Sequence, residues 1–166
     1  MKIFKNVLNL ETLDRCNQEL NFLMDKPAWR CSDQFWGNEI QVGVTGVCTS
    51  TFASPELTEM VSNCIRPYVP EAEHFTVQHY IWHKGSGIST HNDWVYKFAA
   101  TIYLNQTWNI DYGGIFVWED AHTRELSALS PEYNMMVVNT ERENHLVTHM
   151  SMMAPEKRIT LQIWGN

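Results

Sequence analysis

The chain has 166 residues, of which 44% are apolar and 19% are charged, and its 19 acidic and 12 basic side chains give a formal net charge of −7. This length predicts a single domain over residues 1–166 with an apolar core of its own, and an aromatic content of 12% excludes a disordered chain. The acidic balance argues against binding to nucleic acid, and no apolar run approaches the roughly 20 residues of a membrane span.

The N-terminal segment and the cysteines indicate the compartment. Residues 1–6 lack the apolar stretch of a secretory signal peptide, so we expect a cytoplasmic protein. Cys16, Cys31, Cys48 and Cys64 are far apart in the sequence and form no CxxC pair. In a reducing compartment we expect free thiols rather than disulfides or zinc ligands.

The first third of the chain predicts two amphipathic helices with a strand between them. Apolar residues recur at three- and four-residue steps from about 10 to 24, behind Asn9, which is a good N-cap residue. A Ser-Pro pair at 54–55 opens a second helix, and Pro67 ends it. The β-branched and glycine-containing stretch 42–47 indicates a strand with a turn or bulge.

From about residue 74 the apolar pattern changes to a period of two, which is typical of β-strands. The predicted strands are 74–82, 87–93, 97–105, 112–118, 133–138, 143–149 and 157–164, separated by turn residues. Short strands after two helices predict a mainly β, α+β fold. A jelly roll closed over its own interior, with the helices packed on one sheet, is the simplest architecture. The β core would cover about 74–165, after a helical lead-in of about 1–70.

A His-Asn-Asp triplet in the second of these strands is the first candidate for chemistry. Residues two apart in a strand share a face, so His91 and Asp93 could present an imidazole and a carboxylate to one ion while Asn92 points away. A lone His-x-Asp is a weak signal, and taken alone it is better explained by a solvent-exposed turn.

His145, in a later strand-like segment, supplies a third candidate ligand. Two histidines and one carboxylate on a rigid barrel are the ligand set of non-haem Fe(II) oxygenases, which leaves three coordination positions open. A closed structural zinc site would need four protein ligands, commonly thiolates, and no cysteine neighbours these residues.

The last predicted strand has one apolar and one polar face. The apolar face, residues 159–163 at alternate positions, is expected toward the helices, and Arg158, Thr160, Gln162 and Trp164 form the other face. A guanidinium inside a barrel is costly unless an anion meets it, so with Thr160 beside it Arg158 suits a ligand carboxylate. Taken alone, the strand is explained equally well as a surface strand with Arg158 in solvent or paired to an acidic residue.

Together these residues resemble the catalytic core of the 2-oxoglutarate/Fe(II)-dependent oxygenases, and most of all the prolyl 4-hydroxylase-like branch. The resemblance rests on five motifs in order, namely His91-x-Asp93, Tyr103-Leu104-Asn105-x-x-Trp108, Gly113-Gly114, His145-x-Val147 and Arg158-x-Thr160. It covers about 80–164, roughly half of the chain. Each motif is loose by itself, but five in the right order and at plausible spacing are specific.

The resemblance implies a fold and a set of site residues. The family fold is a double-stranded β-helix, a cupin-like jelly roll, which agrees with the architecture predicted above. The implied iron ligands are His91, Asp93 and His145, and the implied 2-oxoglutarate residues are Arg158 at the distal carboxylate, Thr160, Tyr80 and Trp164.

The implied reaction is hydroxylation of an unactivated C–H bond with Fe(II), O2 and the co-substrate 2-oxoglutarate, which is converted to succinate and CO2. Ascorbate is expected to stimulate the reaction. A prolyl residue of a peptide or protein is the first expectation for the substrate. Trp94 and Tyr96, together with residues 82–84, flank the metal triplet and would supply aromatic surfaces for it. A free amino acid or other small molecule is one alternative, and a metal-binding cupin-like module without catalysis is another.

Two departures from the family pattern leave choices open. The spacing from His145 to Arg158 is longer than usual and His149 lies at the more typical distance, so His149 is the alternative third ligand. His145 is favoured because His-x-Val-x-x-Met reproduces the family's pattern. Ile102 stands where some prolyl hydroxylases have a tyrosine that shares the co-substrate carboxylate, which leaves that task to the residues named above.

Other activities of the superfamily fit less well. Nucleobase-repair members have a second arginine six residues after the first, where this chain has Trp164. Halogenating members lack the carboxylate ligand, whereas Asp93 is present here. Trp108 and Trp118 are expected in the core, since aromatic residues in strands usually pack there.

Overall fold

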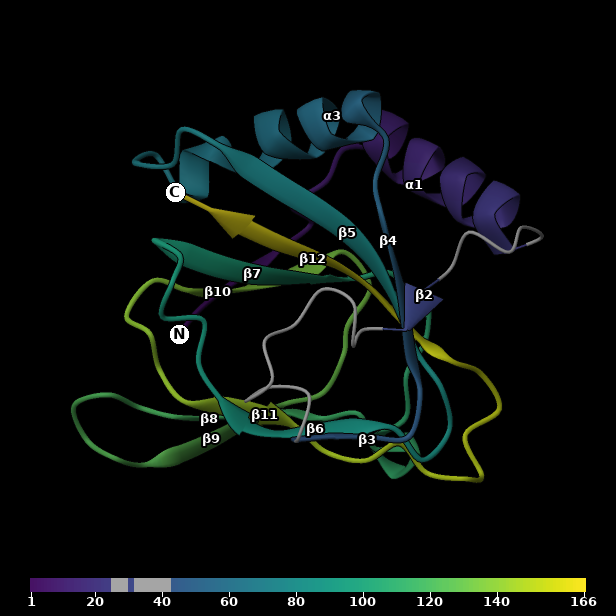
Figure 1. Cartoon of the computed structure of the whole chain (residues 1–166), viewed down its shortest axis with the longest axis vertical. Helices are drawn as coiled ribbons and strands as arrows, with labels where there is room; N and C mark the ends of the chain where they lie inside the picture. The colour runs from purple at the N-terminus through teal and green to yellow at the C-terminus, as the bar shows by residue number, and fades with distance from the viewer. Residues whose placement is uncertain (25–29, 32–42) are drawn as a thin grey trace.

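Two antiparallel β-sheets face each other, and two helices cover the outer face of the larger sheet (Figure 1). The computed structural model describes residues 1–24, 30–31 and 43–166. The larger sheet has the strand order β1 (Lys2–Lys5), β10 (Met135–Asn139), β7 (Phe98–Tyr103), β12 (Arg158–Gly165), β5 (Phe75–Trp82), β4 (Cys48–Phe52) and β2 (Arg30–Cys31). The smaller sheet has the order β3 (Val44–Thr45), β6 (Gly87–His91), β11 (His145–Val147), β8 (Phe116–Glu119) and β9 (Leu126–Leu129).

The two helices begin where local capping signals place them. Helix α1 (Leu10–Met24) follows Asn9, whose Oδ1 accepts the backbone N–H of Thr12 at 2.8 Å. Helix α3 (Pro55–Ile65) follows Ser54, whose hydroxyl oxygen accepts the N–H of Leu57 at 3.1 Å, and a 3₁₀ turn of residues 66–68 succeeds it. Within the described ranges, no helix is both long and apolar enough to cross a membrane.

Alternation along β12 divides its side chains between two cores. Leu161 and Ile163 face outward and pack with Val61 of α3, as the sequence predicts. Trp164 and Arg158 face inward, where the two sheets enclose a second cluster and a pocket. The helices therefore stabilise the sheet from outside and leave its inner face to the site.

The seven predicted strands correspond to seven observed ones, whose ends differ from the predicted ones by up to four residues. The edge strands β1, β2 and β9 and the strand β4 were not predicted. The strand expected at 42–47 is observed as β3, which pairs with β6 in the smaller sheet, whereas β4 pairs with β5 in the larger one. Val42 lies outside the described residues. The predicted free thiols are confirmed for Cys16 and Cys64, whereas the side chain of Cys31 is not described.

A buried ion pair joins α1 to the outer face of β5. Oε2 of Glu19 lies 3.0 Å from Nε2 of His79 and accepts the backbone N–H of Ser54 at 3.1 Å. Burial opposes ionisation of Glu19, but the hydrogen bonds from His79 and Ser54 outweigh it, so the pKa of Glu19 lies below its usual value. The carboxylate thus stabilises the fold in its charged form.

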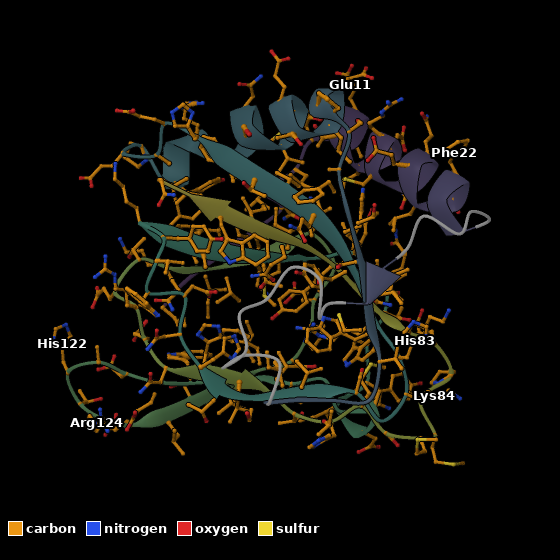
Figure 2. The ribbon with its side chains drawn as sticks, viewed as in Figure 1. Glu11, Phe22, His83, Lys84, His122 and Arg124 are labelled. Atoms are coloured by element: carbon orange, nitrogen blue, oxygen red, sulfur yellow. The ribbon has the colours of Figure 1, made fainter. Side chains whose placement is uncertain are left out.

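Glu19→Gln should lower the free energy of unfolding at pH 7 by about 1–2 kcal/mol, because a charge-assisted hydrogen bond is lost from a largely buried site. A carboxyl group with a lowered folded-state pKa stabilises above the unfolded pKa and loses that effect as pH falls through the folded pKa. The difference from wild type should therefore shrink below about pH 4 in urea unfolding curves. Glu11→Gln, at an exposed position of the same helix (Figure 2), is the control. A difference that does not change with pH would contradict the assignment.

Candidate functional site

Pairing of β6 with β11 brings three potential metal ligands together. His91 ends β6 and is the direct partner of His145, which begins β11. Asp93 follows two residues after His91. One ligand atom from each of the three residues lies within 4.8 Å of those from the other two, and the histidine rings are 4.3 Å apart between centroids. Residues that are far apart in the sequence thus form one compact group.

Backbone carbonyls orient both imidazoles. Nδ1–H of His91 donates to the carbonyl of Ser89 at 2.9 Å, and Nδ1–H of His145 donates to the carbonyl of Glu143 at 3.0 Å. This leaves the Nε2 lone pair of each ring available to a metal. Burial, followed by the nearby His145, lowers the pKa of His91, so that ring is neutral and ready to coordinate at pH 7.

One oxygen of the Asp93 carboxylate accepts a hydrogen bond, and the other is available to a ligand. Oδ1 accepts the indole N–H of Trp164 at 3.2 Å. Oδ2 lies 3.4 Å from Nε2 of His145 and is buried with no hydrogen-bond partner in the described part of the chain. A buried carboxylate oxygen without a donor, next to two imidazole nitrogens, is a donor set that suits Fe(II) and leaves coordination positions free. The residues present therefore fit the metal implied by the sequence.

His149 lies outside this group. Strand β11 ends at Val147, after a register shift between His145 and Val147, and Met150 then pairs with Gly113. His149 is exposed and does not join the cluster of ligand atoms. His149, the alternative third ligand, would share a face with His145 only if the strand continued regularly, and β11 ends at Val147 before His149 is reached.

One pocket of about 820 Å³ includes the metal group and, at its far end, Arg158. The guanidinium is 1% exposed, and its Nε and Nη2 atoms have no hydrogen-bond partner among the described residues. It stacks on the rings of Tyr103 and Trp82, at 5.1 and 5.9 Å from the centroids. Burial lowers the pKa of Arg158, and Tyr103 offsets part of this effect. A buried cation without a carboxylate partner in the described chain requires an anionic ligand.

Gly114 makes room for that guanidinium. Its φ of +63° is in the left-handed region, and a Cβ at this position would lie 2.8 Å from Cδ of Arg158. The preceding Gly113 has a φ of +68°, and a Cβ there would overlap the carbonyl oxygen of His149. The Gly-Gly motif thus allows a tight turn and a close approach to the side chain of Arg158.

The tyrosine beside Arg158 is Tyr103, which sequence reasoning did not assign to the site. Ile102, at the position where some prolyl hydroxylases have a tyrosine, faces the helices. Tyr103 and Tyr80 flank Thr160 on neighbouring strands. The Tyr103 hydroxyl and Thr160 Oγ1 are buried without hydrogen-bond partners in the described structure. Every residue of β7 is buried, so the sequence pattern alone does not show which of Ile102 and Tyr103 faces inward; the pairing of Tyr103 with Thr160 does.

The aromatic residues named from the sequence fall into different places. Trp94, 63% exposed, and Tyr96, whose ring lies 5.8 Å from that of Trp164, line the pocket together with Trp164. Trp82 also lines the pocket, but it is buried against Arg158. His83 and Lys84 lie at the edge of the molecule (Figure 2). The predicted core residues Trp108 and Trp118 are half-buried against the inner cluster.

Comparison with known proteins gives one family and a consistent fold. Residues 73–166 match the model of the 2OG-Fe(II) oxygenase superfamily. None of the curated proteins matches the chain in sequence.

Three solved structures illustrate the likeness in fold. A prolyl-4-hydroxylase of Pseudomonas putida is 14% identical, with a TM-score of 0.73 over 99% of this chain and 91% of that one. A prolyl hydroxylase of Trichoplax adhaerens, in complex with a peptide fragment of the hypoxia inducible factor oxygen degradation domain, is 15% identical, with a TM-score of 0.75 over 99% and 82%. The viral collagen prolyl hydroxylase of Paramecium bursaria Chlorella virus-1, in complex with 2-oxoglutarate, is 12% identical, with a TM-score of 0.66 over 98% and 93%. The predicted jelly roll, a double-stranded β-helix, is thereby confirmed.

Proposed function

This chain belongs to the 2OG-Fe(II) oxygenase superfamily, and we propose that it hydroxylates a prolyl residue of a peptide or protein, with release of succinate and CO2. It is a dioxygenase that requires Fe(II), 2-oxoglutarate and O2. One observation carries the proposal: a single pocket includes both a His-Asp-His group and a buried guanidinium that has no anionic partner among the described side chains. The whole of 1–166 would act as one domain.

The two ends of the pocket would have separate tasks. His91, Asp93 and His145 would hold Fe(II), which supplies the means to activate O2 when 2-oxoglutarate is bound. Trp164 keeps Oδ1 of Asp93 in place, so Oδ2 would be the oxygen available to hold the metal. Arg158 at the far end would bind the distal carboxylate through its unpaired Nε and Nη2 atoms.

Thr160, Tyr103 and Tyr80 would complete the co-substrate pocket. Thr160 is in register with both tyrosines, and its buried hydroxyl can donate to the same carboxylate as Arg158. Stacking of the guanidinium on Tyr103 and Trp82 fixes its orientation before the ligand arrives. The enclosure keeps water from competing for these donors.

Tyr103→Phe should raise the KM for 2-oxoglutarate by about 3- to 10-fold, since one hydrogen bond in an enclosed pocket is worth ~1 kcal/mol. The ring and its stacking on Arg158 are retained, so the loss reports the hydroxyl alone. Tyr133→Phe, at a half-buried position in the outer core, is the matched control and should leave the KM unchanged. An unchanged KM for Tyr103→Phe would remove this residue from the pocket.

The mouth of the pocket supports a peptide substrate. Trp94 and Val95 are exposed apolar residues that line it, and Tyr96 packs on Trp164 behind them. Flat aromatic surfaces suit proline rings and the extended backbone around them. Ascorbate would stimulate turnover, and the free thiols Cys16 and Cys64 support a cytoplasmic location.

Proline-containing peptides should stimulate release of succinate from 2-oxoglutarate and gain the mass of one oxygen, whereas free L-proline should be a poor substrate. Trp94→Ala should raise the peptide KM by about tenfold, because an exposed aromatic anchor contributes on the order of 1–2 kcal/mol. Phe22→Ala is the matched control, because Phe22 is exposed to the same degree on α1 (Figure 2). Efficient turnover of free amino acids with peptides ignored would favour a small-molecule substrate, and absence of succinate release with iron and 2-oxoglutarate would favour a binding module.

A further inference from the structure

The inner face of the larger sheet carries a row of polar side chains that the proposed chemistry does not use. Gln162 of β12 is in register with Gln78 of β5 on one side and Thr101 of β7 on the other. All three line the pocket. The next partners outward in the same row, Val137 of β10 and Phe52 of β4, are apolar. The polar character is therefore confined to the part of the row that faces the pocket.

The hydrogen bonds of this row are incomplete. The hydroxyl of Thr101 donates to Oε1 of Gln162 at 2.7 Å, which orients the Gln162 amide and makes its Nε2 group the donor that a ligand could use. Gln78 is only 5% exposed, and its buried Oε1 atom accepts no hydrogen bond from the described residues. A buried acceptor of this kind destabilises the fold, and an apolar side chain of similar volume would avoid that cost. The arrangement is explained if a ligand supplies the missing donor.

The row lies close to the proposed metal centre. Residues two apart in a strand lie about 7 Å apart on the same face. Trp164 is the next inward residue after Gln162, and its indole holds Asp93. Thr160 and Arg158, which would bind the co-substrate, precede Gln162 on the same face. A substrate held near the metal is thus within reach of Gln78 and Gln162.

The chemistry of the row selects an uncharged ligand group. Nε2 of Gln162 offers a donor and Oε1 of Gln78 offers an acceptor, and Gln78, Thr101 and Gln162 include no charged side chain. An amide, with one C=O and one N–H, matches this pair, whereas a carboxylate would leave the acceptor unsatisfied. We propose that Gln162 and Gln78 bind the backbone amide that follows the reacting residue of a peptide substrate, Gln162 at its carbonyl and Gln78 at its N–H. This inference rests on the proposed function, and it names the backbone amide as a part of the peptide substrate that the protein recognises.

The test compares a proline peptide that stimulates the wild type with its ester analogue, in which oxygen replaces the N–H after the proline. The wild type should bind the ester about tenfold more weakly, because Gln78 then lacks its donor. Gln78→Met should bind the peptide about tenfold more weakly than the wild type and should no longer distinguish peptide from ester. Affinities are measured by calorimetry on Mn(II)-loaded protein with 2-oxoglutarate and without O2, and KM values are measured with Fe(II). Gln106→Met, at an exposed glutamine, is the control and should behave as wild type.

Two outcomes separate this inference from the proposed function. If the wild type hydroxylates peptide and ester equally, or if Gln78→Met retains the wild-type preference for the peptide, the amide is not recognised by Gln78 and the proposed function still stands. If the wild type binds no proline peptide and turns over a free amino acid instead, both are overturned.

Discussion

Alanine in place of Asp93, His91 or His145 is expected to abolish turnover of 2-oxoglutarate. Each substitution removes one of three protein ligands. Loss of a residue that only hydrogen-bonds to a metal ligand already lowers metal affinity or activity roughly 10- to 100-fold. Loss of a ligand itself should therefore lower activity by more than about 100-fold. The structure supports the assignment through the 4.8 Å cluster of ligand atoms and the unpartnered Oδ2 atom of Asp93.

The measurement is an anaerobic titration with Fe(II) and then 2-oxoglutarate, in which wild type should develop a weak visible charge-transfer band and the three variants should not. His149→Ala is the matched control, since His149 is an exposed histidine four residues from His145, and it should retain activity. An inactive His149→Ala together with an active His145→Ala would overturn the choice of third ligand. Melting temperatures close to wild type would show that the variants are folded.

Arg158→Ala is expected to raise the 2-oxoglutarate requirement by at least about tenfold, because a charge-assisted pair in an enclosed pocket contributes about 1.5–3 kcal/mol. Arg158→Lys should be milder but still impaired, since an ammonium cannot bind both carboxylate oxygens as a guanidinium does and does not stack on Tyr103 in the same way. Arg124→Ala, at the exposed tip of the β8–β9 hairpin (Figure 2), is the control.

Stability gives a second measurement of the same site. A buried cation without a partner destabilises the protein in the absence of ligand, so Arg158→Met should match or exceed the melting temperature of the ligand-free wild type while losing 2-oxoglutarate binding. With Mn(II) and saturating 2-oxoglutarate, the wild type should melt at a higher temperature and Arg158→Met should not respond. A wild-type melting curve that does not move with 2-oxoglutarate would contradict the role of Arg158.

Much of the fold could be predicted because its signals are local. Helix α1 has the predicted bounds, since the apolar steps and the Asn9 cap are contained within the segment itself. Period-two patterns predicted seven of the strands for the same reason. The edge strands β1 and β9 were missed, because short strands at a sheet edge carry few buried residues and hence no clear alternation.

Tyr103 shows where local patterns lose information. Every residue of β7 is buried, because both faces of this strand are covered, so the burial pattern does not distinguish Ile102 from Tyr103. Register with β12 makes the distinction, since it places Tyr103 opposite Thr160 and beside Arg158. The residue identified from the structure therefore differs by one position from the one considered in the sequence.

The sequence by itself determined the fold class, the order of the motifs and the inward face of the last strand, because periodicity and spacing are properties of neighbouring residues. Only the tertiary structure decided which histidine joins His91 and Asp93, since β11 ends before His149 reaches the group. It also decided that Nε and Nη2 of Arg158 and Oε1 of Gln78 are buried without hydrogen-bond partners among the described residues. Whether a polar group is satisfied depends on atoms brought together from distant segments, and that is set by strand pairing rather than by local sequence.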